Sequence, residues 1–362
     1  MTKEQTPAGA LVAPRSMAVR DRFGFFGRST LLTHTFLALL AFAIFLGVVE
    51  MTNDLHNSIW LTPIAYELCA AAGLTVLVGL SGQISLGHGA FMMVGAYTTA
   101  LLLEHWHTSQ GNAQLIPVLL GAGAVSAVFG GVVGLAAARL RGPYLAGATL
   151  AFAVGLPQVV NYTHLANTLG GNNGIVIIAP NPPSAFDLYR WQSLMCGIAA
   201  VVLLWFLANI ARSRLGRSMR AVRDDEIAAS LCGLSVARVQ ILAFVVSAAC
   251  AGVGGGLLAI VRLVAGPTAF GLALSLGLLA AVVFGGLGSL AGALYGSIVV
   301  VLLPYWSQDI TDALAIHSGK VTNNLPLLVY GIVLALAMLV FPSGVQGAVL
   351  RLRRVLTAAV RR

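Results

Sequence analysis

Long apolar runs recur along the chain, and they constrain its fold more than any other feature. Hydrophobic residues make up 58% of the 362 residues, and charged residues make up only 9%. Because a membrane-crossing helix needs roughly 20 apolar residues, we expect an all-α polytopic membrane protein. The runs predict about ten crossings, near residues 30–49, 60–80, 89–103, 115–138, 143–160, 194–211, 241–264, 270–284, 289–304 and 325–341.

The positive charges are distributed unevenly, and their positions predict the topology. Basic residues concentrate in a tail at 1–29, a turn at 139–141, a loop at 212–240 and a tail at 342–362. Such segments stay on the cytoplasmic side of a membrane. We therefore predict cytoplasmic N and C termini, a membrane domain over 30–341, a cytoplasmic loop at 212–240 and an external loop at 161–193.

The same distribution argues against other classes of protein. The net charge of +9 is a topology signal, and no basic module interleaved with aromatic residues predicts a nucleic-acid partner. The four cysteines have no paired spacing, and most lie inside apolar runs. Neither a disulfide framework nor a metal site is therefore expected.

The apolar run at 79–97 is interrupted by polar and glycine-rich positions and then resumes. A broken span exposes backbone N–H and C=O groups, which lipid tolerates only where protein or a water-filled path satisfies them. We therefore expect this first break to be a hinge or to line a translocation pathway near its inner gate. The candidate residues are Gly79, Ser81, Gly82, Gln83, Ser85, Gly87, His88 and Gly89.

Two interpretations of the polar side chains in the first break stay open. They can hydrogen-bond a zwitterionic substrate, or they can satisfy the backbone groups that the break releases. A lone His88 is more often a satisfied structural histidine than a substrate contact. A second glycine-rich break contains Gly285, Gly286 and Gly288, and one hypothesis is that the two breaks face each other. Glycines also crowd the runs at 115–138 and 241–264, where close packing of helices is expected.

The loop at 212–240 is the most informative polar segment. Its pattern predicts a helix over 221–231 that ends at Gly233 in a left-handed cap, and a second helix that begins at Ser235. The first helix would present an apolar strip of Ile227, Ala228 and Leu231, edged by Asp224, Asp225 and Glu226. Such a strip either docks into a groove of a cytoplasmic partner or lies on anionic lipid headgroups.

The run EIAASLCG at 226–233 resembles the EAA loop of bacterial ABC importer permeases, in which two alanines precede a glycine by a fixed gap. The wider stretch at 216–252, the motif GLSGQISLGHGAF at 79–91 and the glycine-rich run at 285–292 are similar, in order, to permeases of the branched-chain amino-acid uptake family. The long basic loop and the chain length look more like the M-type than the H-type of the two related permeases in such importers.

The resemblance implies a non-enzymatic translocation subunit in the bacterial cytoplasmic membrane, which alternates access for branched-chain or related amino acids. It implies a second permease subunit, two cytoplasmic ATPase subunits and an external solute-binding protein as partners, with membrane lipid around them. No cofactor would be bound directly, because the partner subunits use the ATP. The resemblance assigns ATPase coupling to Asp225, Glu226, Ala228, Ala229 and Gly233.

The main alternative is a self-sufficient ion-coupled secondary transporter or channel for small polar solutes. Such proteins normally keep acidic residues deep in their spans, and no Asp or Glu lies near the middle of a predicted crossing. An intramembrane enzyme would need a catalytic constellation within the spans, which the sequence does not display. The pair Gly319 and Lys320 lacks the flanking residues of a phosphate-binding loop, so separate ATPase subunits are expected to supply the energy.

Overall fold

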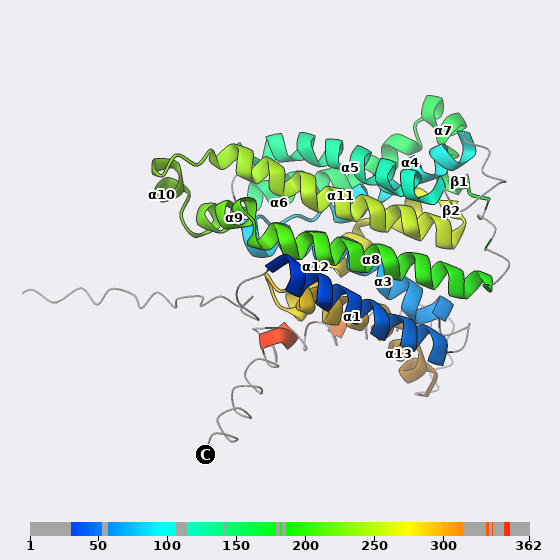
Figure 1. Ribbon diagram of the computed structural model, residues 1–362. Coiled ribbons are helices and arrows are strands. Elements are labelled where there is room, and N and C mark those ends of the chain that lie inside the picture. Colours follow the sequence, from blue (N-terminus) through cyan, green and yellow to red (C-terminus); the bar gives the residue numbers. More distant parts are fainter. Residues whose placement is uncertain are drawn as a thin grey trace, which may run out of the picture.

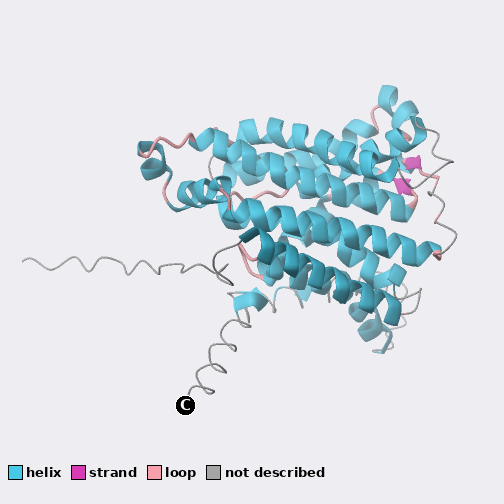
Figure 2. Ribbon diagram, in the orientation of Figure 1, coloured by secondary structure: helices cyan, strands magenta, loops and turns pink. Residues whose placement is uncertain are grey.

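The computed structural model describes residues 30–52, 57–105, 114–140, 142–178, 182, 186–313, 331–332, 335 and 344–347. Within these ranges the chain forms a bundle of helices whose axes run in roughly one direction (Figure 1). Helix dominates the described chain, and loops are confined mostly to the ends of the bundle (Figure 2). The predicted all-α class is confirmed, apart from one short strand pair described below.

Each predicted crossing from 30–49 through 289–304 falls on a helix. The first half of the bundle contains α1 (Thr30–Met51), a π-helical turn (Asn57–Leu61), α3 (Thr62–Ser81), α4 (His88–His105), α5 (Leu115–Ala137) and α6 (Pro143–Val160). The second half contains α8 (Leu188–Arg212), α11 (Val236–Arg262), a 3-10 turn (Pro267–Phe270), α12 (Leu272–Gly285) and α13 (Leu290–Ala313).

Seven helical segments of the described chain are long and apolar enough to cross a membrane. They are Leu32–Met51, Ile59–Ser81, Leu115–Ala137, Pro143–Val160, Leu188–Arg212, Val236–Arg262 and Pro267–Gly285. The chain is therefore a multi-pass membrane protein. The predicted crossing at 325–341 lies outside the described residues except for 331–332 and 335, and so do the basic tails at 1–29 and 342–362 except for 344–347.

The core of the bundle is built around α3 and α11. In the apolar span that includes α3, 89% of the residues are buried. In that of α11 the share is 72%, whereas in that of α1 it is only 11%. The glycines of α11 explain this packing: a Cβ on Gly255 would overlap the main chain of Met92 in α4, and a Cβ on Gly254 would lie 2.7 Å from the carbonyl oxygen of Tyr66 in α3. The close helix packing predicted for this run is confirmed.

The two ends of the bundle carry different structures. At one end lie the short helices α9 (Arg214–Asp224) and α10 (Glu226–Leu231), and at the other lie α7 (Thr163–Leu169), a 3-10 turn (Gly171–Asn173) and the strands β1 (Ile175–Val176) and β2 (Val264–Ala265) (Figure 1). The strands pair in antiparallel fashion, with Ile175 opposite Ala265. Residues 161–178 and the helices α9 and α10 thus lie at opposite ends of the bundle.

The prediction of one helix over 221–231 is wrong at Asp225. This residue has extended backbone angles, φ −159° and ψ 111°, and it separates α9 from α10. Its carboxylate accepts hydrogen bonds from the backbone N–H groups of Ile227 at 2.8 Å and Ala228 at 3.0 Å. Aspartate side chains compete in this way with the helical backbone, so Asp225 begins a new helix where continuous helix was expected.

Candidate functional site

The first break begins where α3 ends. Gly82 caps α3 with φ +72°, a left-handed conformation that favours glycine. Its N–H bonds to the carbonyl oxygen of Val78 at 3.1 Å, and the N–H of Gln83 bonds to that of Leu77 at 3.4 Å. Residues 82–87 then leave helical structure until α4 starts at His88.

The non-helical segment runs back into the bundle. Gly79 lies against Gly288, just beyond the end of α12, whereas the N–H of Gly89 donates to the hydroxyl of Ser275 in the first turn of α12, at 2.9 Å. The first turn and the end of α12 are roughly 15 Å apart, since each helical residue rises about 1.5 Å. Helix α4 therefore begins inside the protein, which makes it a discontinuous membrane helix.

Hydroxyl groups of neighbouring helices and of Ser85 within the segment accept hydrogen bonds from its backbone. The N–H of Leu86 donates to the hydroxyl of Thr149 in α6 at 3.0 Å, and the N–H of Gly87 donates to the hydroxyl of Ser85 at 3.3 Å. Together with the bond from Gly89 to Ser275, these contacts supply the acceptors that lipid cannot. Protein contacts therefore stabilise the break at these N–H groups.

His88 is fully buried and has a partner at each ring nitrogen. Its Nε2 lies 2.7 Å from the hydroxyl oxygen of Ser247 in α11, and its Nδ1 lies 3.3 Å from that of Ser85. The ring also contacts Phe91 edge-on, with centroids 5.6 Å apart. This environment favours the structural interpretation of His88, because both nitrogens are engaged with protein.

Two polar side chains of the break differ from His88. Ser81 and Gln83 are 5% and 6% exposed. Within the described chain, the Ser81 hydroxyl and the side-chain amide oxygen of Gln83 have no hydrogen-bond partner. Buried polar atoms are costly to leave unpaired. Among the predicted pathway residues, these two have hydrogen-bonding capacity left for a polar solute or water.

The hypothesis that the two breaks face each other is confirmed. A Cβ on Gly79 would overlap the backbone of Gly288, so the two segments touch at their main-chain atoms. Gly288 and Gly286 both have positive φ, +79° and +113°, and Gly285 packs against Gly292 at the start of α13. The second break is thus a tight glycine turn between α12 and α13 that rests on the end of α3.

The predicted coupling residues lie together on α10 and its flanks. Ile227 and Leu231 are 74% and 83% exposed, whereas Ala229 is buried. The side-chain amide of Gln240 in α11 donates to the carboxylate of Glu226 at 3.0 Å, which ties the start of α10 to the membrane helix. Gly233 has φ +81°, so the predicted left-handed cap is confirmed, and Ser235 precedes α11 without a side-chain capping bond.

Removing the cap of α10 is expected to loosen this helix. Asp225→Ala deletes two hydrogen bonds to backbone N–H groups, and loss of such a cap costs about 1 kcal/mol. Amide hydrogen exchange in α10 should then accelerate by about fivefold, measured by mass spectrometry on the purified protein. Asp225→Ser is the matched control because serine caps helices equally well, and equal exchange in both variants would contradict the capping role.

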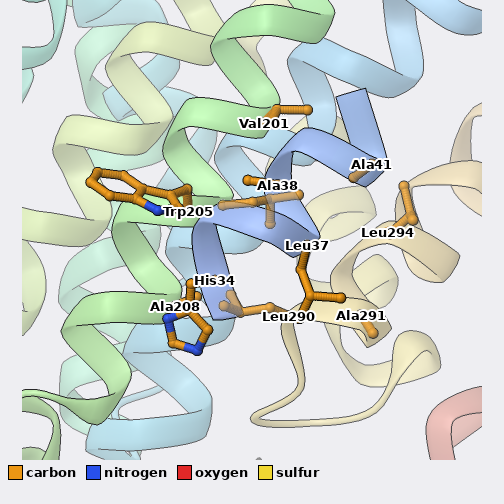
Figure 3. Close-up of a pocket in the computed structure, with 11 residues that line it drawn as sticks. His34, Leu37, Ala38, Ala41, Val201, Trp205, Ala208, Leu290, Ala291 and Leu294 are labelled. Carbon is orange, nitrogen blue, oxygen red and sulfur yellow. The ribbon is translucent and has the colours of Figure 1, made fainter. Parts of the chain in front are cut away.

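A cavity of about 200 Å³ lies between α1, α8 and α13, away from the first break. Figure 3 shows its lining, which consists of His34, Leu37, Ala38, Ala41, Val201, Leu204, Trp205, Ala208, Leu290, Ala291 and Leu294. The main polar group of the cavity, the His34 ring, already has a hydrogen-bond partner, because its Nδ1 atom lies 2.8 Å from the Asn209 side-chain oxygen. These apolar walls suit hydrocarbon and offer little to a zwitterion.

Sequence reasoning missed the residues that hold the first break in place. Thr149, Ser247 and Ser275 are fully buried polar residues on three different helices, and each is an isolated polar position in an apolar run, which is the signal that could have revealed them. Arg223 was interpreted only as part of a basic loop, although its side chain reaches the backbone of α3. Within the described ranges, no three His, Cys, Asp or Glu residues gather where they could hold a metal ion.

A helical bundle with a protein-satisfied break in its core defines a multi-pass membrane protein of the discontinuous-helix kind that transporters use. Comparison with known families is more specific: the family described as "Branched-chain amino acid transport system / permease component" matches residues 58–339. The chain belongs to this family. No solved structure matches it.

Curated relatives agree with this assignment. The high-affinity branched-chain amino acid transport system permease protein LivM of Salmonella typhimurium is 34% identical over 299 residues, and LivM of Escherichia coli is 33% identical over 299 residues. Both alignments cover 75% of this chain and 65% of the relative's length. LivH of Salmonella typhimurium is 27% identical over 289 residues, which cover 76% of this chain and 90% of LivH. The higher identity to LivM agrees with the M-type resemblance.

Proposed function

We propose that this chain is the translocation subunit of an ATP-driven importer for branched-chain or related amino acids. Its transmembrane helices would alternate access when separate ATPase subunits bind and hydrolyse ATP. The chain itself would bind no cofactor and catalyse no reaction. Membership of the permease family supports this proposal, and so do the names of the curated relatives.

The observation that carries the proposal is the surface of α10. This helix projects at one end of the bundle (Figure 1), and it leaves Ile227 and Leu231 almost fully exposed beside the acidic residues Asp224 and Asp225. An apolar strip edged by charges on a short helix is typical of helix-in-groove recognition. An ATPase subunit with an apolar groove rimmed by basic residues fits it.

The topology that follows places α9 and α10 in the cytoplasm, because their loop is rich in arginine. Both termini would lie on the same side, and about ten crossings would complete the membrane domain. The loop at 161–193 would face outward, where a solute-binding protein delivers substrate. A second, related permease subunit would complete the pathway in the inner membrane of a bacterium.

The alternative, a self-sufficient secondary transporter, has less support. Ion-coupled transporters usually have several acidic residues deep in their spans. In the described chain Glu104 lies at the end of α4, whereas Glu67 is the ninth of the 23 residues of the apolar span Ile59–Ser81. The exposed surface of α10 would also have no role in such a protein. Separate ATPases therefore remain the better explanation for the source of energy.

Reconstitution into liposomes tests the proposal. The chain, co-expressed with a related permease, ATPase subunits and a solute-binding protein, is expected to import radiolabelled L-leucine only when ATP is present on the α10 side. Uptake by the chain alone, driven by a proton or sodium gradient, would refute the importer. Replacing the ATPase subunit by a variant that binds ATP without hydrolysing it is the control, and sustained uptake should then stop.

A further inference from the structure

The structure assigns a specific role to Arg223: it links the α9–α10 loop to the first break, so that movement of α10 is transmitted to the end of α3. This inference rests on the proposed function and names the residue through which the ATPase contact would reach the pathway. Arg223 would be a positioning residue, because it acts through the backbone of Gly79.

The contact itself is direct. The Nη1 atom of Arg223 donates a hydrogen bond to the carbonyl oxygen of Gly79, at 2.5 Å, across 144 positions of sequence. The aliphatic part of the same side chain packs against Gly82, where a Cβ would lie 2.6 Å from the Arg223 Cγ atom. Arg223 therefore holds both the last helical turn of α3 and the glycine at which the break begins.

The end of a helix is a suitable anchor for a guanidinium group. The last carbonyl groups of an α-helix lack partners within the helix and carry partial negative charge. The N–H groups of Gly82 and Gln83 bond to Val78 and Leu77, and neither of them bonds to Gly79. The carbonyl of Gly79 is thus available to Arg223, and the bond is charge-assisted.

Asp224 orients the guanidinium group. Its Oδ1 atom accepts from Nε of Arg223 at 3.2 Å and from Nη2 at 2.9 Å, which leaves Nη1 directed toward Gly79. The planar guanidinium group binds Asp224 with two nitrogens and Gly79 with the third. Only arginine can do this, because a lysine ammonium cannot keep the same geometry. Asp225 then begins α10 in the next position, so only one residue separates the link from the cap of the docking helix.

Helix α9 is held firmly enough to act as a rigid connector. Helix α9 is tied to α8, since Nη2 of Arg220 donates to the carbonyl oxygen of Ala211 at 2.9 Å. Met219 and Val222 of α9 are buried against the bundle. A displacement of α10 by a partner would therefore move α9 together with the end of α8, and the Gly79 carbonyl with them. Because Gly79 rests on Gly288, the second break would move as well.

A thiol-labelling experiment tests this link in the complete reconstituted complex. In a Cys232→Ser background, the other three cysteines are buried, and Ile84→Cys places a reporter at a position of the break that is 51% exposed. With native Arg223, a non-hydrolysable ATP analogue is expected to change the labelling rate at position 84. Arg223→Ala should abolish that change and lower L-leucine uptake per ATP hydrolysed by roughly tenfold, within the range of allosteric couplings.

Two further variants distinguish coupling from a general structural effect. Arg223→Lys keeps the charge and should restore the response only in part. Arg217→Ala removes an arginine from the same helix whose Nη1 donates to the carbonyl oxygen of Arg212 and does not reach α3, so it should respond to the analogue as the native chain does. An unchanged response in Arg223→Ala, or no response with native Arg223, would overturn the inference.

The test separates the two proposals. If the importer proposal fails, the native complex shows no ATP-dependent uptake of L-leucine. If only the Arg223 link fails, the native complex transports, and Arg223→Ala transports and responds to the analogue equally well.

Discussion

Gly255→Ala is expected to destabilise the folded protein strongly, although it adds a single methyl group. The new Cβ would overlap the main-chain oxygen, carbon and Cα atoms of Met92, and main-chain atoms cannot rotate away. Helices α4 and α11 would have to separate, and overpacking of this kind costs about 1–3 kcal/mol. The loss should appear as a lower midpoint temperature for unfolding in detergent micelles. Gly95→Ala, which would place a Cβ on the backbone of Gly252 from the opposite helix, should behave alike.

The control is the same glycine-to-alanine change at a helical position where the new Cβ would contact no other atom. A Cβ on Gly155 in α6 would have no atom within 4 Å, so Gly155→Ala adds no overlap and replaces glycine with a better helix former. That exchange favours the helix by about 1 kcal/mol, and the midpoint temperature should stay the same or rise. If both variants were equally stable, the close approach of α4 and α11 would not be important for folding.

Gly233→Pro is expected to abolish coupling between ATP hydrolysis and transport. Proline requires φ near −65°, whereas Gly233 has φ +81° and donates its N–H to the carbonyl oxygen of Ser230 at 3.0 Å. Both the cap and the direction of the chain from α10 to α11 would be lost. In the reconstituted complex, L-leucine uptake per ATP hydrolysed should fall by tenfold or more, since couplings typically amount to about 5–150-fold.

The matched control uses the same position. A Cβ on Gly233 would meet no atom within 4 Å, so the backbone conformation alone limits substitution there. Asparagine tolerates the left-handed conformation better than other residues with a side chain, and Gly233→Asn should keep most of the coupling. Normal transport by Gly233→Pro would show that the connection from α10 to α11 does not transmit the ATPase signal.

The arrangement as a whole connects the short helix α10 to both breaks of the bundle. Arg223 connects α9 to Gly79, and Gly79 rests on Gly288 of the second break. The two discontinuities of the bundle therefore meet at the end where α10 projects. Packed main-chain contacts of this kind shift between discrete arrangements and do not deform gradually.

Local features of the chain were predictable from the sequence. Apolar length placed the helices from 30–49 through 289–304, because a run that must satisfy its own backbone in lipid has no alternative to helix. Gly233 was predicted to adopt a left-handed cap, which depends only on neighbouring residues. The break at 79–97 was visible for the same reason, since polar and glycine residues interrupt an otherwise apolar run.

Competition between a side chain and the helical backbone for the same N–H groups was harder to predict. The pattern at 221–231 indicated one helix, and the structure divides it at Asp225, whose carboxylate bonds to the N–H groups of Ile227 and Ala228. The strand pair of Ile175 and Ala265 also escaped prediction. Two residues per strand leave no alternation in the sequence, and the partner lies far along the chain.

By itself, the sequence determined the class of protein, the positions of its apolar helices, the presence of two breaks and the family to which the chain belongs. Only the tertiary structure decided which residues satisfy the first break, namely Thr149, Ser247 and Ser275, and which loop residue reaches it, namely Arg223. Apolar length and turn chemistry act within a few residues, so a sequence displays them. A hydrogen bond between groups more than sixty residues apart depends on how helices pack, and that is fixed only when the whole bundle has formed.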